Sequence, residues 1–356
     1  MSYRILFSGI LITGLLALTS CQNTIAGLQS KPTALGKTSE LVVVCDQPMW
    51  DGAVGDSLIF YYESPYPIMP QPEPMFDVRH FTTDDLNADA LRKELRTYLV
   101  IGNLSDEDSP TTNMIREDLG PEKMRRAAED PAYFTSVGQD KWARGQLIMY
   151  LFGKSDDDII DKLIRSFPTI AQRINQHDKV QVNAATYLDG ENVPMSTRVR
   201  EKFGVELKIP GDFKLAVDRE NFLWVRKDTR ELTSSIAIRA FDYTDKNQLE
   251  LDGLINMRDR LGILVQGSSV GSFMRTNAED LPVYTYQKEL GGRYVVESRG
   301  IWELTEDFLG GPFLNYAIID GNRILMIDCF VFAPGTTKRK YVQQLEHVVS
   351  SLKFAG

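Results

Sequence analysis

The chain has 356 residues, of which 43% are hydrophobic and 10% aromatic, as in an ordinary globular protein. It carries 40 lysines and arginines against 49 aspartates and glutamates, which gives a formal net charge of −9. This acidic balance argues against a nucleic-acid partner and against a basic patch that docks on anionic lipid.

The first twenty residues have the layout of a bacterial export signal. Arg4 precedes an uncharged, mostly apolar run that reaches Thr19, and the run is short for a spanning helix, which needs ~20 apolar residues. It ends in Leu18-Thr19-Ser20-Cys21, which resembles the lipobox of bacterial lipoproteins. In that family the signal is cleaved before the cysteine, which then carries a diacylglycerol and an acylated amine. We therefore expect a signal peptide at 1–20 and lipidation of Cys21; a plain signal with a chance cysteine is the alternative.

Residues 21–39 are expected to form a tether between this anchor and a folded body. They are rich in Thr, Ser, Gly and Lys and contain few large apolar residues, so they cannot bury enough surface to fold by themselves. A tether of this kind lets the folded part stand away from the membrane.

Residues 40–190 alternate strand and helix signals, so we expect an α/β domain. A β-branched run at 41–45 predicts a buried strand. Five prolines between 64 and 74 predict an extended loop, and Ser155 with Asp158 predicts the capped start of a long helix that kinks at Pro168. The other expected elements are helices at 51–62, 86–95, 113–119 and 122–129, strands at 76–81 and 97–101, and a hairpin of strands at 133–137 and 146–152.

Residues 200–356 instead show a series of short strands, which predicts an antiparallel sheet with helices on one side and makes the whole chain α+β. Asp320-Gly321 is a hairpin signal, and the apolar stripe of the last helix predicts that it packs on the sheet. The expected strands are 205–209, 213–217, 222–227, 235–243, 271–276, 283–290, 293–304, 314–319 and 323–333, with helices at 247–262 and 337–353.

This second part resembles the PsbP/Mog1-like fold. The likeness rests on "VELKIPGDFKLAVD" (205–218), a strand, a Pro-Gly turn and a strand, and on "RILMIDCFVFAPGTTKRKYVQQLEHVVSSLKF" (323–354), a long strand followed by a closing helix. Members of that fold are mostly non-catalytic binding and assembly factors. The resemblance therefore implies a fold and a broad kind of role, and it brings no site residues.

The mature chain also resembles a family of uncharacterised lipoproteins from Bacteroidota. The matching stretches are "WARGQ" (142–146), "GIWELTEDFLGGPF" (300–313) and "FVFAPGTTKRKYVQQLE" (330–346). The resemblance implies an outer-membrane destination but no activity or cofactor. Surface-export tags of such lipoproteins look acidic just after the cysteine, and residues 22–27 hold no acidic cluster, so we expect the periplasm-facing leaflet.

Cys45 and Cys329 remain once Cys21 is lipidated. Each lies in an apolar, strand-like run, so they are either two buried small apolar side chains or a disulfide that an oxidising compartment permits.

The sequence shows no strong catalytic or metal-binding constellation. Its three histidines share no ligand spacing and there is no Cys-x-x-Cys, so neither a metal nor a cofactor is expected. Gly267-Ser268-Ser269-Val270-Gly271 matches the hydrolase pattern G-x-S-x-G, but a helix precedes it and a strand follows, the reverse of the required context. Gly310-Gly311-Pro312 is interpreted as a tight turn. The chain is therefore expected not to be an enzyme, although the sequence leaves this open.

Possible interface or ligand contacts gather near that Gly-Gly stretch. Aromatic residues at a turn are enriched at protein interfaces, and they are equally compatible with core packing beneath a loop. The candidates are Trp302, Glu303, Asp307, Phe308 and Phe313, together with Arg144 and Gln146 from the first domain.

Two functional hypotheses follow from these observations. The first is a non-catalytic envelope lipoprotein that contacts or assembles with a protein partner. The second is a binding protein or hydrolase for an envelope glycan or small ligand, with its site in the cleft between the domains.

Overall fold

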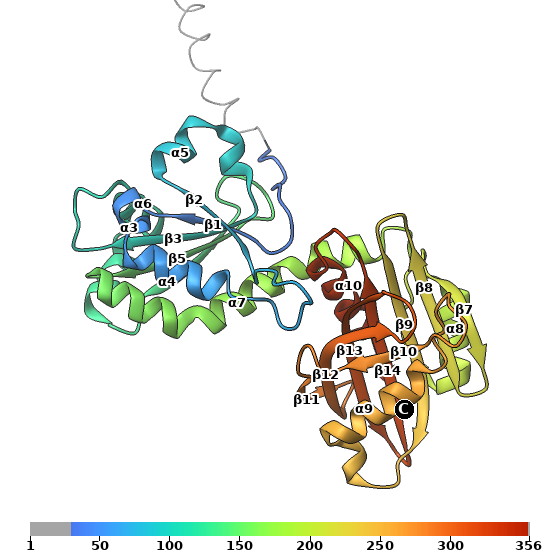
Figure 1. Cartoon of the computed structure of the whole chain (residues 1–356). Helices are drawn as coiled ribbons and strands as arrows, with labels where there is room; N and C mark the ends of the chain where they lie inside the picture. Colours follow the sequence, from blue (N-terminus) through green and yellow to red (C-terminus); the bar gives the residue numbers. More distant parts are fainter. Residues whose placement is uncertain (1–29, 355–356) are drawn as a thin grey trace, which may run out of the picture. The chain divides into compact units, whose positions relative to one another are not determined.

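The computed structural model describes residues 30–354, so the expected signal peptide, Cys21 and the start of the tether lie outside the described residues. Within this range, no helix is both long and apolar enough to cross a membrane. The chain divides into two compact units, Met1–Val54 with Arg79–Lys162 and Gly55–Val78 with Leu163–Gly356. Figure 1 shows the helices and strands of both units.

The first unit is built on a five-stranded sheet with the order β2-β1-β3-β5-β4. Strands β1, β3 and β5 run parallel, and β4 is antiparallel to β5. Every residue of β1 and β5 is buried, because a parallel strand covered on both faces must be apolar on both. The strands are β1 (Glu40–Val44), β2 (Asp77–Phe81), β3 (Thr97–Asn103), β4 (Thr135–Gln139) and β5 (Leu147–Gly153).

Helices of very different length accompany this sheet, from the four residues of α3 to the 31 residues of α7. Helix α6 contains one non-helical residue, Gly120 at φ 73°, which divides it where the sequence predicts two helices. The single helix expected at 86–95 is wrong: Asp89 is extended and its carboxylate accepts the Leu91 N–H at 2.9 Å, which starts a separate 3₁₀ helix. The helices are α3 (Gln47–Trp50), α4 (Ala53–Tyr62), α5 (Thr83–Ala88), η1 (Ala90–Glu94), α6 (Pro110–Glu129) and α7 (Asp156–Thr186), of which α4 and α7 cross the division between the units.

The second unit is a curled antiparallel sheet with the order β10-β12-β13-β14-β9-β8-β7, and β11 pairs with β12. The fold is therefore α+β. Its strands are β6 (Val205–Glu206), β7 (Lys214–Arg219), β8 (Phe222–Asp228), β9 (Thr233–Asp242), β10 (Met274–Asn277), β11 (Tyr284–Leu290), β12 (Arg293–Leu304), β13 (Gly310–Asp320), β14 (Arg323–Phe332) and β15 (Lys353–Phe354), and its remaining helices are α8 (Val193–Phe203), η2 (Lys246–Leu249), α9 (Leu251–Gly262) and α10 (Arg339–Val349).

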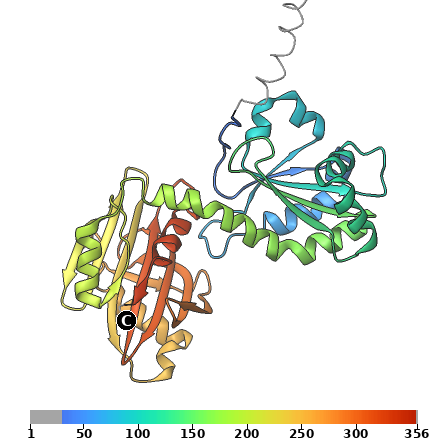
Figure 2. The same ribbon diagram turned by 180° about the vertical axis from the view of Figure 1, so that it is seen from behind.

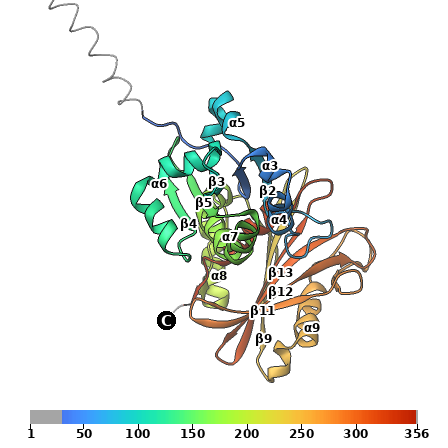
Figure 3. The ribbon, with the colours of Figure 1, turned by 90° about the vertical axis from the view of Figure 1, so that its left-hand side faces the viewer.

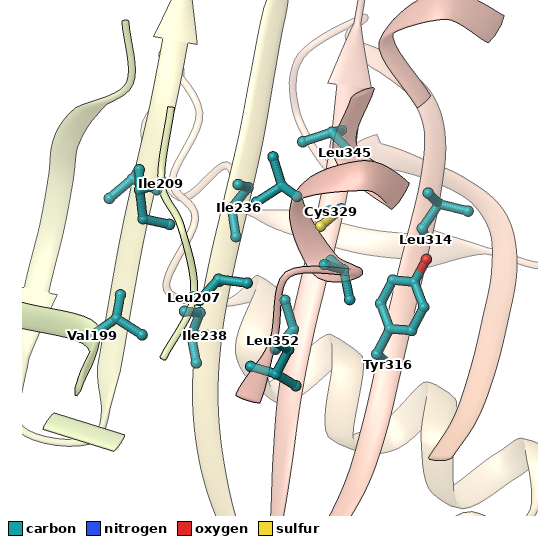
Figure 4. Close-up of a cluster of buried hydrophobic side chains, with 14 of the residues drawn as sticks. Val199, Leu207, Ile209, Ile236, Ile238, Leu314, Tyr316, Cys329, Leu345 and Leu352 are labelled. Carbon is teal, nitrogen blue, oxygen red and sulfur yellow. The ribbon is translucent and has the colours of Figure 1, made fainter. Parts of the chain in front are cut away.

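Alternating side chains of β14 supply two apolar cores, one on each face of this sheet. Leu325 and Cys329 join the core that α8 and α10 cover, whereas Met326 and Phe330 join the core that α9 covers. Figures 2 and 3 show α8 and α9 on opposite faces of the sheet, and Figure 4 shows Cys329 within the first core. The expectation of helices on one side only is therefore wrong. It missed α8, which begins at the Asn192 cap and ends at the left-handed Gly204.

The two compact units divide the chain differently from the predicted boundary near residue 190. Residues 55–78 and the long helix from Leu163 belong with the C-terminal sheet. The predicted domain boundaries stay a prediction.

Candidate functional site

Two loops of the second unit are joined by one carboxylate. Asp307, between β12 and β13, accepts hydrogen bonds from Ser269 Oγ at 2.7 Å and from the Ser268 N–H at 3.1 Å, both in the loop between α9 and β10. Hydrogen bonds from Ser272 and Ser269 lower the pKa of the Asp307 carboxyl below its ordinary value of 3.8. The carboxylate is therefore charged at neutral pH and holds the two loops together. We call this arrangement the Asp307 clamp.

The clamp depends on a glycine at position 267. A Cβ atom added to Gly267 would collide with the Asp307 carboxylate and with Ser272 Oγ. Glycine therefore allows the close approach of the Asp307 carboxylate, and a larger residue would require that carboxylate and Ser272 Oγ to shift.

Each clamped loop carries a fully exposed apolar side chain. Val270 directly follows Ser269, and Phe308 directly follows Asp307. Exposing a Phe or Val side chain forgoes about 1.5–3 kcal/mol of burial free energy. We call these two side chains, which project from loops that Asp307 joins, the apolar projection; exposed apolar side chains on ordered loops are candidates for interface contacts.

A shallow groove of about 620 Å³ lies beside this projection, between Pro70, the end of β12 and the start of β13. Glu303 lies in the groove and is paired with Arg275, whose Nε donates to it at 2.7 Å, and with Asn277 at 2.9 Å. The groove holds four carboxylates and one cation, so its field is acidic. Its carboxylates are Asp280, Glu303, Glu306 and Asp307.

Two of the predicted aromatic contacts belong to the core. Trp302 is 5% exposed, donates from Nε1 to the Val331 carbonyl at 3.3 Å and packs edge-on against Phe330. Phe313 is 2% exposed and lies beneath the Arg258 guanidinium, 3.6 Å from ring centroid to Cζ. Of the three aromatics around the turn, Phe308 is therefore the one that faces solvent.

The Gly-Gly-Pro stretch is not the turn expected from the sequence. Gly310 and Gly311 open strand β13 opposite Glu303 and Trp302, and the turn lies before them. A Cβ on Gly311 would collide with the Val331 carbonyl oxygen, so these glycines permit close strand packing.

Arg144 and Gln146 belong to the first unit, and both take part in its local structure. Gln146 is 1% exposed; its Oε1 accepts the Trp142 N–H at 2.8 Å and its Nε2 donates to the Leu95 carbonyl at 2.7 Å. The Arg144 backbone N–H donates to the Pro32 carbonyl at 2.8 Å. Both residues therefore order the chain around the first unit's sheet.

Cys45 and Cys329 are free and buried, the former in the first unit and the latter in the second. Burial, with nearby Asp46 and Asp51, raises the pKa of the Cys45 thiol to about 12, and burial raises that of Cys329 well above its ordinary value. Neither thiol is activated as a nucleophile.

Between residues 30 and 354, no group of three or more His, Cys, Asp or Glu side chains is placed to hold a metal ion. Ser269, the serine of the hydrolase-like pattern, lies on a helix-to-strand loop and donates its hydroxyl hydrogen to Asp307. This is the opposite of the strand-to-helix turn on which a hydrolase nucleophile sits.

The second unit also holds a pocket that sequence reasoning missed. It is lined by Glu297, Arg299, Tyr316 and Glu346 among others. The signal that could have indicated it is a charged pair, Glu297 and Arg299, at alternate positions in the buried part of β12. Both side chains face one side of the sheet, and buried charges need partners.

Comparisons with known proteins identify domains without an assigned function. Residues 34–185 match a Domain of unknown function (DUF8532), and residues 192–351 match a second Domain of unknown function (DUF4837). No curated protein matches the chain. These results fit an uncharacterised family.

Several solved structures are similar over part of the chain. A protein from Bacteroides thetaiotaomicron is 14% identical with a TM-score of 0.24, over 43% of this chain and 46% of that one, so the match spans less than half of that protein. LpqN of Mycobacterium tuberculosis, described as involved in cell envelope biogenesis, is 10% identical with a TM-score of 0.26, over 42% of this chain and 82% of that one. Human STARD10 is 10% identical with a TM-score of 0.21, over 45% and 75%.

Proposed function

We propose that this chain is a non-catalytic docking protein of the bacterial envelope that binds a protein partner through Phe308 and the acidic groove beside it. The observation that carries this proposal is the full exposure of Phe308 on a loop that Asp307 fixes. A loop that Asp307 holds in place loses less backbone entropy when Phe308 enters a partner's pocket, and aromatic residues of this kind dominate binding energy at interfaces.

The groove indicates the chemistry of that partner. Glu306 and Asp280 lie beside Phe308, so a partner with an apolar pocket flanked by lysines or arginines is complementary. The chain's own net charge of −9 favours the same kind of partner.

The lipid anchor and the location at the outer membrane are part of the same proposal. Lipidation of Cys21 holds the protein at the outer membrane, on the periplasm-facing leaflet, since the residues after the cysteine carry no acidic cluster. Two or more acyl chains give an effectively stable attachment. Labelled palmitate should be incorporated into the parent protein and not into Cys21→Ser, which tests the anchor. Loss of the protein when intact cells are treated with protease would contradict its location on the periplasm-facing leaflet.

The PsbP/Mog1-like likeness supports a binding role within this proposal. It rests on the strand, Pro-Gly turn and strand of 205–218 and on strand β14, which leads into α10. Members of that fold are mostly non-catalytic binding and assembly factors.

Site-specific photocrosslinking in living cells tests the docking proposal. A photoreactive phenylalanine analogue is placed at Phe308, and as a control at Leu188, which is equally a large exposed apolar residue but lies outside the groove. We expect the analogue at position 308 to crosslink one protein with a basic surface. We expect the analogue at position 188 not to crosslink that protein. The same products at both positions, or none at 308, would overturn the proposal.

A further inference from the structure

The second unit holds a pocket of about 360 Å³ that shares no lining residue with the groove beside Phe308. Its floor comes from strands β11, β12 and β13, and its walls from helices α7 and α10 and from Tyr66. All of these belong to one compact unit. The volume lies within the range of small-molecule sites, ~300–1,000 Å³.

A buried ionic network forms the polar part of this pocket. Glu297, 1% exposed, accepts hydrogen bonds from Arg299 Nε at 2.6 Å and from Lys288 Nζ at 2.5 Å. Arg299 also pairs with Glu346, and the Tyr66 hydroxyl donates to the Glu346 carboxylate at 3.2 Å. Burial alone would lower the pKa of Arg299, but Glu346 and Glu297 more than offset it and raise the pKa. The guanidinium is therefore charged and fully neutralised by its neighbours.

Tyr316 provides a hydrogen-bonding group that the network does not use. Its side chain is 6% exposed and lines the pocket, and among residues 30–354 its hydroxyl has no hydrogen-bond partner. Because Tyr316 lines the pocket, this hydroxyl can donate a hydrogen bond to a ligand there and accept one from it. Burial raises the pKa of Tyr316 well above its ordinary value, so the group remains a neutral donor and acceptor.

The charged residues that line the pocket indicate the chemical class of its ligand. Its lining holds four carboxylates and three cations, so its net charge is negative and disfavours a phosphate or other polyanion. Fixed ionic groups that already neutralise one another still offer strong donors and acceptors to hydroxyl groups. Val182, Leu290 and Val349 add apolar walls, which suit the C–H face of a sugar ring.

We propose that this pocket binds a small, neutral, hydroxyl-rich ligand of the size of a mono- or disaccharide, with a hydrogen bond to the Tyr316 hydroxyl. The site is independent of the docking groove, so either proposal can fail alone.

Calorimetric titration tests the proposal. The full chain with Cys21→Ser is titrated with a panel of neutral mono- and disaccharides, and with inorganic phosphate for comparison. We expect at least one saccharide to bind with an affinity that added salt does not change, because its binding releases no counterions, and we expect phosphate not to bind. Tyr316→Phe, which removes only the unpaired hydroxyl, should weaken binding about tenfold.

Two controls separate binding from folding. Tyr284→Phe makes the same chemical change on the exposed strand β11 and should leave affinity unchanged. Tyr316→Phe should not lower the melting temperature, because the hydroxyl has no partner to lose in the free protein. The proposal is overturned if no saccharide in the panel binds, if phosphate binds instead, or if both Tyr→Phe changes weaken binding equally.

Discussion

The carboxylate of Glu73 accepts the backbone N–H of Arg339 at 2.8 Å, across 266 residues of sequence. The same carboxylate accepts the Lys338 N–H at 2.7 Å. These two donors are the N-cap, Lys338, and the first residue of α10, and the N-cap side chain makes no capping hydrogen bond of its own. Glu73 thus satisfies the free N–H groups of that helix and favours its dipole. The proline-rich segment, with Met69 in the core, is therefore part of the second unit's packing.

Replacing Glu73 by Gln should lower the free energy of unfolding by about 1–2 kcal/mol, because a helix terminus loses its charged cap. Urea denaturation followed by circular dichroism measures this change. Glu279→Gln, at an exposed position, should stay within about 0.5 kcal/mol of the parent. An equal effect of both changes would show that the cap contributes nothing.

The buried ion pair between Arg258 and Asp328 gives a second prediction. Asp328 is 0% exposed and accepts from Arg258 Nε at 2.9 Å and from Asn315 at 3.0 Å. Asp328→Asn leaves the buried guanidinium without a counterion, which should cost about 3–5 kcal/mol.

The matched control for this change is Glu129→Gln, which breaks an exposed pair with Arg125 and should cost at most about 1 kcal/mol. Thermal unfolding compares the two variants. Similar losses of stability in the two variants would mean that burial does not determine the contribution of the Arg258 pair.

The Asp307 clamp should open in acid. The folded pKa of Asp307 lies below 3.8, so its bonding contribution is complete above the unfolded pKa and is lost as pH falls through the folded value. Exchange of the Ser268 and Ser269 amide hydrogens, followed by NMR, should accelerate below pH ~3.8 relative to other loops once intrinsic rates are corrected. Asp307→Asn should show no such step; a step that persists in this variant would assign it to another group.

Thiol reactivity distinguishes the two interpretations of Cys45 and Cys329. In the Cys21→Ser protein both remaining thiols are buried and free, so neither should react with a thiol reagent at pH 8 in the native state. Two thiols should react after unfolding without reductant. Finding none would instead demonstrate a disulfide.

Local pattern predicted most strands of both units, since apolar runs report burial and turn residues report where the chain reverses. The β1 run and the Asp320-Gly321 turn between β13 and β14 are examples. The partners of Glu73 and Asp307 could not be predicted in the same way. Each contact joins segments far apart in sequence, and only tertiary packing brings the donors to the carboxylate. Phe308 and Trp302 illustrate the same limit, because two aromatics beside one turn have opposite exposures.

The central claim, that Phe308 on the Asp307 clamp is a docking anchor, is tested most directly by affinity for the partner identified by crosslinking. Dissociation constants are measured for the purified partner and four chains: the parent, Phe308→Ser, Gly267→Ala, which displaces the Asp307 carboxylate, and Leu188→Ser. We predict that Phe308→Ser weakens binding at least tenfold, that Gly267→Ala weakens it less, and that Leu188→Ser leaves it unchanged. Equal affinity of Phe308→Ser and the parent would contradict the account.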